Sequence, residues 1–119
     1  MRIVVAGWLR FNGNEATCTE IIRGGAEHIA ASRAEPGCVA YNWAVDPIEP
    51  GKIHVYEEWE SERALLGHFR DPSYAAMRAQ LERWTLTGFG VQLYSVAGVE
   101  PVYDEAGQPR PAIFGVALD

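Results

Sequence analysis

The segment KIHVYEEWES, residues 52–61, decides the fold because it changes from strand chemistry to helix chemistry along its length. Its first part is rich in the β-branched and aromatic residues that strands favour. Ser61, at its end, is a residue type that caps helix N-termini, and a stripe formed by Leu65, His68 and Phe69 follows it. The segment therefore predicts a strand that runs directly into an amphipathic helix.

Two adjacent acids, Glu57 and Glu58, lie between Tyr56 and Trp59 in this strand. Successive side chains of a strand point to opposite faces of the sheet. Glu57 then shares a face with Trp59, and Glu58 shares the other face with Tyr56. At most one of the two acids is expected to enter a common site, which disfavours a catalytic carboxylate pair.

Outward from this segment, apolar periodicity and turn residues divide the chain into alternating elements. The pair Gly24-Gly25 lies inside the first expected helix, where each glycine costs about 1 kcal/mol relative to alanine. This pair indicates that the helix packs closely on a flat surface, which we take to be a sheet. The expected strands cover residues 2–11, 38–45, 52–59 and 88–99, and the expected helices begin at residue 14 or 17, at 61 and, capped by Ser73, at 73.

The order strand, helix, strand, strand, helix, strand predicts an α+β domain of the ferredoxin-like, split βαβ type, with an antiparallel sheet and helices on one face. The predicted sheet carries Val, Trp and Tyr residues on both faces, and an uncovered apolar face normally marks an interface. A second copy packed sheet to sheet is the simplest cover. We therefore expect a two-fold homodimer.

The chain is expected to hold one ferredoxin-like domain, residues 1–100, and a C-terminal arm, residues 101–119. The arm contains several prolines but also the apolar run AIFGVAL, which a disordered tail would not need. It is expected to hold a short strand that either extends the sheet or reaches over a partner subunit at the dimer interface.

Composition limits the partners and the location of the protein. The formal net charge is -6 and no cluster of Lys or Arg is present, which disfavours nucleic acid. With Lys52 as the one lysine, a basic membrane patch is also unsupported. Neither a signal peptide nor a spanning segment is apparent, and Cys18 and Cys38 are interpreted as reduced. We expect a cytoplasmic protein.

Three short stretches, in this order and spacing, resemble the antibiotic biosynthesis monooxygenase (ABM) family, also called quinol monooxygenase-like, of the dimeric α+β barrel superfamily. They are ASRAEPGCVAY at residues 31–41, YEEW at 56–59 and HFRDPSY at 68–74. The order of elements extends the resemblance over about residues 2–98. In the family, the first stretch leads from a helix into strand two, the second ends strand three, and the third closes a short helix.

The resemblance implies a ferredoxin-like protomer, a homodimer, and a pocket between each sheet and its own helices. It also implies a monooxygenase that oxidises a small aromatic phenol, quinol or anthrone with O2 and uses no cofactor. Two alternatives stay open. One is a dimeric module that binds a small molecule without catalysis, and the other is a haem-binding or haem-degrading relative.

Trp59 and His68 are the residues that the resemblance favours as catalytic. Trp59 matches a pocket-lining tryptophan of the family, although an ordinary core tryptophan is the alternative; its indole would donate a hydrogen bond into the cavity. His68 is expected to act as a base or to orient the ligand, against a structural histidine. Glu57 matches a family glutamate and would need a partner such as Arg10 or a backbone donor. A hydrogen-bonding anchor at the strand end is favoured for it over a general base.

Other side chains are expected to form the substrate-binding walls, with core packing as the alternative for several of them. His28 and His54 show no metal-ligand spacing with His68, so no metal site is predicted. In polyketide-oxidising relatives an asparagine stands where this chain has Val55, and their helix arginine is only approximately matched by Arg78. The predicted substrate-binding residues are Tyr41, Asn42, Glu57, Phe69, Tyr74 and Met77.

Overall fold

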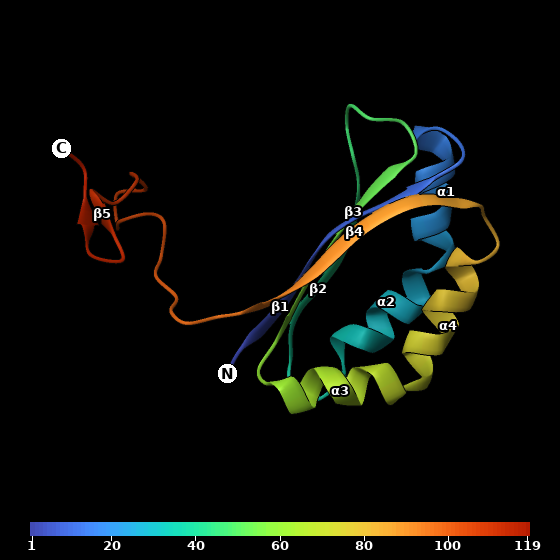
Figure 1. Cartoon of the computed structure of the whole chain (residues 1–119), viewed down its shortest axis with the longest axis horizontal. Coiled ribbons are helices and arrows are strands. Elements are labelled where there is room, and N and C mark those ends of the chain that lie inside the picture. Colours follow the sequence, from blue (N-terminus) through green and yellow to red (C-terminus); the bar gives the residue numbers. More distant parts are fainter.

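A computed structural model describes the whole chain, residues 1–119, as an antiparallel sheet with helices against one face and a C-terminal arm (Figure 1). The strands in the sheet are ordered β2-β3-β1-β4. The elements are β1 (Ile3–Phe11), α1 (Glu15–Gly24), α2 (Ala26–Arg33), β2 (Cys38–Val45), β3 (Lys52–Trp59), α3 (Glu62–Arg70), α4 (Pro72–Leu81), β4 (Leu86–Ser95), β5 (Ala112–Ile113) and β6 (Val116–Ala117).

The sheet has the ferredoxin-like topology that the sequence predicted. β1 pairs with both β3 and β4, β2 pairs with β3, and all three pairings are antiparallel. In the β2–β3 pairing Tyr41 lies opposite Glu57, so the two side chains share one face. That face is the one the helices cover, and the register therefore brings the YEEW strand under α3 and α4.

Side-chain caps begin three of the helices. The Asn14 side chain accepts from the Thr17 amide, in a reciprocal capping box, and Ser61 Oγ accepts from the Ala64 amide at 3.1 Å. The prediction that Ser73 caps the last helix was wrong. Asp71 is the cap, because its carboxylate accepts from the Ser73 amide at 3.0 Å and Pro72 takes the first helical position.

The glycine pair separates two helices and contacts a third. Gly25 is both the C-cap of α1 and the N-cap of α2, so the single helix expected from the sequence is divided there. A Cβ at Gly25 would meet Met77 Sδ at 2.6 Å, and a Cβ at Gly24 would meet Gln80 Nε2 at 2.2 Å. The close packing is real, but its partner is α4 and not the sheet.

The core between the sheet and the helices consists of two adjoining clusters. One surrounds the fully buried Trp59 and the other surrounds the fully buried Ile21 and Ile53. Their buried members are Ile3, Val5, Ile29, Tyr41, Trp59, Leu65 and Met77 in the first cluster and Phe11, Cys18, Ile21 and Ile53 in the second.

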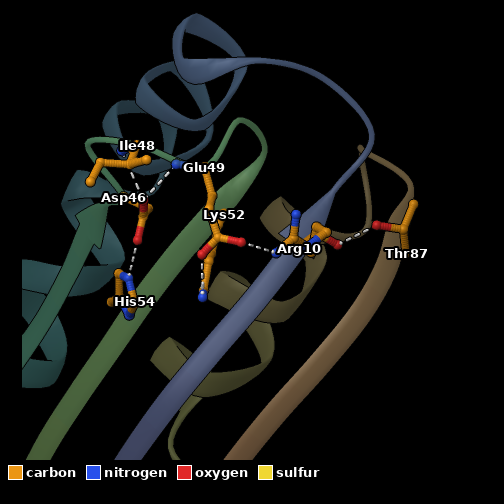
Figure 2. Close-up of polar contacts among 7 residues, drawn as sticks. All are labelled: Arg10, Asp46, Ile48, Glu49, Lys52, His54 and Thr87. Carbon is orange, nitrogen blue, oxygen red and sulfur yellow. Dashed lines mark hydrogen bonds and ion pairs between the residues drawn. The ribbon is translucent and has the colours of Figure 1, made fainter.

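A polar network holds the β2–β3 hairpin end against β1 (Figure 2). Asp46 accepts from backbone amides of the loop and lies 2.7 Å from His54 Nε2. Glu49 bridges Arg10 at 2.9 Å and Lys52 at 2.8 Å. The loop between β2 and β3 is thereby tied to both β1 and β3 at this end of the sheet.

The C-terminal arm leaves the end of β4 and stands clear of the sheet and the helices (Figure 1). β5 and β6 pair only with each other, as a separate two-stranded sheet. The predicted short strand is thus present, but it does not extend the main sheet. None of the helices combines the length and the apolar character needed to cross a membrane.

Candidate functional site

A cavity of about 590 Å³ lies between the helix-covered face of the sheet and helices α3 and α4. Most of the side chains that line it are apolar, and they come from all four strands of the sheet. Volumes of several hundred Å³ with mainly apolar walls are typical of small-molecule sites. The cavity opens to solvent along the wall that β4 forms, because Phe89 and Leu93 in this strand are 69% and 64% exposed.

Three ionisable side chains form a buried chain beside this cavity. His68 Nδ1 lies 2.9 Å from Glu35 Oε2, and His68 Nε2 lies 4.0 Å from Glu57 Oε1. The side chains of His68, Glu35 and Glu57 are 1%, 8% and 10% exposed. His68 and Glu57 line the cavity, whereas Glu35 stands behind the imidazole. This row of three side chains brings an acid and an imidazole to one apolar site, where they can exchange a proton with a ligand.

Trp59 holds Glu57 and does not reach the cavity. Its indole Nε1 donates to Glu57 Oε1 at 3.0 Å, which is possible because residues two apart on a strand share a face. Trp59 is fully buried and is absent from the cavity lining. The expectation that its indole donates into the cavity was therefore wrong. Arg10, suggested as a partner for Glu57, pairs with Glu49 instead.

Burial sets the proton affinity of Glu57. Loss of solvent raises the pKa of this carboxyl above its ordinary value, and the charge of Glu35 raises it further. The Trp59 N–H and His68 lower the pKa of Glu57, but they do not cancel the increase that burial causes. Glu57 therefore gives up its proton at a higher pH than an exposed glutamate, as a general base working in a dry site does.

Glu35 is the functional candidate that the sequence reasoning missed. Its carboxylate accepts from Ser73 Oγ at 3.0 Å as well as from the imidazole, and Ser73 Oγ in turn accepts from Ser32 Oγ at 3.3 Å. These contacts join the end of α2 to the start of α4. The one available signal was that Glu35, Ser32 and Ser73 all lie inside the stretches that carried the family resemblance.

Aromatic rings surround His68. Tyr41 and Tyr74 meet its ring edge-on, with centroids at 5.5 and 5.4 Å, and Phe69 stacks edge-on against Tyr74 at 5.2 Å. Burial raises the pKa of Tyr41 to about 12, so its hydroxyl keeps its proton near neutral pH. The rings form flat apolar walls that suit an aromatic ligand.

Of the predicted substrate-binding residues, all except Asn42 line the cavity. Asn42 lies on the outer face of the sheet, where its side chain accepts from Arg33 at 3.0 Å. Strand alternation explains the difference, because the neighbouring Tyr41 and Trp43 take the inner face. The residues that the structure brings together at the cavity are Tyr41, Glu57, His68, Phe69, Tyr74 and Met77.

Two polar groups outside the ionisable chain also belong to the cavity wall. Arg78 Nη1 donates to the Tyr74 hydroxyl at 3.3 Å, and its Nε lies 3.6 Å from Glu82. Trp43 lines the cavity, and its buried Nε1 has no hydrogen-bond partner. No group of three His, Cys, Asp or Glu side chains could hold a metal ion.

Comparison with known proteins gives both a family and a fold. A family model described as antibiotic biosynthesis monooxygenase matches residues 10–80. An uncharacterized protein of Synechocystis is 33% identical over 72 residues, which are 60% of this chain and 48% of that protein. The chain thus aligns with about half the length of this curated relative.

Solved structures with low sequence identity share the fold. A candidate antibiotic biosynthesis monooxygenase from Deinococcus radiodurans superposes with a TM-score of 0.72 at 19% identity, covering 86% of this chain and 99% of that one. A second candidate antibiotic biosynthesis monooxygenase, from Nitrosomonas europaea, superposes with a TM-score of 0.69 at 14% identity, covering 81% of this chain and 90% of that one. A Mycobacterium tuberculosis protein superposes with a TM-score of 0.67 at 20% identity, covering 85% of this chain and 100% of that one.

Proposed function

We propose that this protein, which belongs to the antibiotic biosynthesis monooxygenase family, oxidises an electron-rich phenol, quinol or anthrone with O2 in the cavity above Glu57 and His68, without a bound cofactor. The observation that carries the proposal is the placement of a buried acid–imidazole–acid chain at the wall of an apolar cavity. The family match supports a monooxygenase-like role, and the identity of the substrate is part of the proposal.

The protein's part in this reaction is to take a proton in a place that excludes water. Glu57, with its pKa raised by burial, accepts the acidic proton of the ligand, and the imidazole of His68, whose Nε2 lies 4.0 Å from Glu57 Oε1, stabilises the anion that the ligand becomes. Glu35 fixes the orientation of the imidazole through Nδ1.

The substrate supplies the electrons. For an anthrone, deprotonation of the methylene carbon gives an anion that O2 can oxidise. The CH2 group becomes C=O as four electrons pass to O2: one oxygen atom stays in the ketone, and the other leaves as water with both methylene hydrogens. Apolar walls such as Tyr41, Phe69 and Met77 hold the flat anion away from water during this step.

Oxygen consumption with a panel of anthrones and quinols tests the proposal. Wild-type protein should consume O2 and form product, and His68→Ala should lower the rate because it removes the charge-stabilising imidazole. His54→Ala is the matched control, since His54 is exposed on the outer face of the sheet. Turnover at the same rate without O2 would contradict the proposal.

One observation favours binding without catalysis as the second candidate. Val55 lines the cavity at the position where polyketide-oxidising relatives carry an asparagine, so this position offers the ligand no amide. A ligand that raises the melting temperature and returns unchanged in the presence of O2 would support binding alone. The haem alternative is less favoured, because both ring nitrogens of His68, the histidine of the cavity wall, face carboxylates.

A two-fold homodimer is part of the proposal. The outer face of the sheet carries small side chains such as Ala6, Ala40 and Ala44 beside the exposed Tyr56 and Tyr94. A flat surface of this kind can be covered by the same face of a second copy. Light scattering should give twice the chain mass, and a monomer at micromolar concentration would contradict the assembly.

A further inference from the structure

Two separate apolar surfaces of this chain have no partner. The first is on the arm, defined here as residues 96–119, where no residue is fully buried. Seven of its large apolar side chains are 58% to 83% exposed, which is unusual for so short a segment. They are Val99, Val102, Tyr103, Ile113, Phe114, Val116 and Leu118.

The arm presents these side chains on a defined scaffold. Glu100 Oε2 accepts from Arg110 Nη1 at 3.0 Å and from the Phe114 amide at 3.1 Å. The Arg110 amide donates to the Val102 carbonyl at 3.0 Å, and Phe114 and Gly115 turn the β5–β6 hairpin with positive φ angles of 46° and 82°. The hydrogen bonds give the arm a fixed shape that a complementary surface can recognise.

The second surface is the wall of the cavity that β4 forms. β4 is an edge strand without a charged residue, a type of strand that proteins normally cover. Phe89, Val91 and Leu93 line the cavity from this strand and are 69%, 37% and 64% exposed. The cavity mouth is therefore an apolar opening beside an unpaired backbone edge.

The arm does not cover the mouth of its own cavity. In Figure 1 it continues from the Ser95 end of β4 away from the helices, on the opposite side of the molecule from α4. Its backbone would have to reverse direction after β4 to reach Phe89. A second copy can supply an arm to this mouth without any reversal, and a two-fold axis would make the exchange reciprocal.

We propose that the arm of a second copy lies along β4 and closes the cavity mouth, with Ile113 and Phe114 completing the wall next to Phe89 and Leu93. Each site is then built from two chains. A stable interface takes roughly 20–30 residues from each partner, and the arm together with β4 provides a surface of this size. Closure of the cavity by the partner's arm does not depend on the reaction that the cavity supports.

Mixing two proteins that each carry one accessible cysteine tests the exchange. A tagged full-length chain carrying Phe89→Cys is mixed with an untagged full-length chain carrying Phe114→Cys, both with Cys38→Ser, and oxidised under mild conditions. Cys18 is fully buried and can stay. Both introduced cysteines replace exposed side chains, so folding should be unaffected. The mixed disulfide dimer is identified by its mass on a non-reducing gel.

The expected result is a mixed dimer from the Phe89→Cys and Phe114→Cys pair. Leu66→Cys replaces Phe89→Cys in the matched control, because Leu66 is 54% exposed on α3 but does not line the cavity. Equal yield with this control would overturn the proposal. So would an internal disulfide in a single chain that carries both Phe89→Cys and Phe114→Cys, since the arm would then close its own cavity.

Discussion

Glu35, which lies behind the His68 imidazole, gives the most quantitative prediction. Glu35→Ala removes the acceptor for two buried donors, His68 Nδ1–H at 2.9 Å and Ser73 Oγ–H at 3.0 Å. The His68 side chain is 1% exposed and Ser73 is 6% exposed, so water cannot replace the lost carboxylate. Each unsatisfied buried donor costs about 1–3 kcal/mol, which gives about 2–6 kcal/mol of lost unfolding free energy.

Urea unfolding of three variants at neutral pH measures this effect. Glu35→Gln keeps a carbonyl acceptor and should lose only about 1 kcal/mol, the difference between a charged and a neutral hydrogen bond. Glu27→Ala, an exposed acid on α2, is the matched control and should stay within about 0.5 kcal/mol of wild type. If Glu35→Ala were no more destabilising than Glu27→Ala, the buried chain would not exist as described.

Three further predictions concern the scaffold. Gly7→Ala should destabilise the fold by about 1–3 kcal/mol or more in urea unfolding, because a Cβ there would lie 2.0 Å from the Gly90 carbonyl oxygen in β4, whose backbone cannot yield easily. Gly67→Ala, inside α3 with nothing near its added Cβ, should instead stabilise by about 1 kcal/mol; a loss of stability would refute the helix packing. The loss of stability caused by Asp46→Asn should become smaller as the pH falls. Loop amides and His54 hold the pKa of Asp46 below its usual value, so its contribution is present above about pH 4 and is lost on acidification through the lowered pKa. A gap in urea midpoint between wild type and Asp46→Asn that does not narrow between pH 6 and pH 2 would contradict this.

The strand and helix order was predictable because local signals agreed with the global fold. The alternation around Trp59 placed Glu57 inward and Glu58 outward, and the structure has Glu57 buried and Glu58 beside Arg2 on the outer face. Ser61 marked the start of α3 for the same local reason. Patterns that repeat along one element can be recognised without knowing what packs against it.

The errors arose where a contact between distant elements decides the outcome. The sequence shows that Gly25 is compatible with close packing, but only the fold shows that Met77 is the neighbour and that the helix breaks there. Trp59 satisfies its N–H on Glu57 and so has no donor left for a ligand. Glu35 reaches His68 across 33 residues of sequence, a distance that no local pattern encodes.

The central claim is that Glu57 accepts a proton from a ligand in the cavity, and the pH dependence of O2-dependent turnover tests it most directly. Turnover needs ionised Glu57, so the wild-type rate should fall on acidification through its pKa, which burial holds above the ordinary 4.5. Glu57→Gln should lose turnover and this pH dependence, while Glu58→Gln, on the outer face, should keep both. A Glu57→Gln protein with the wild-type rate and pH profile would contradict the account.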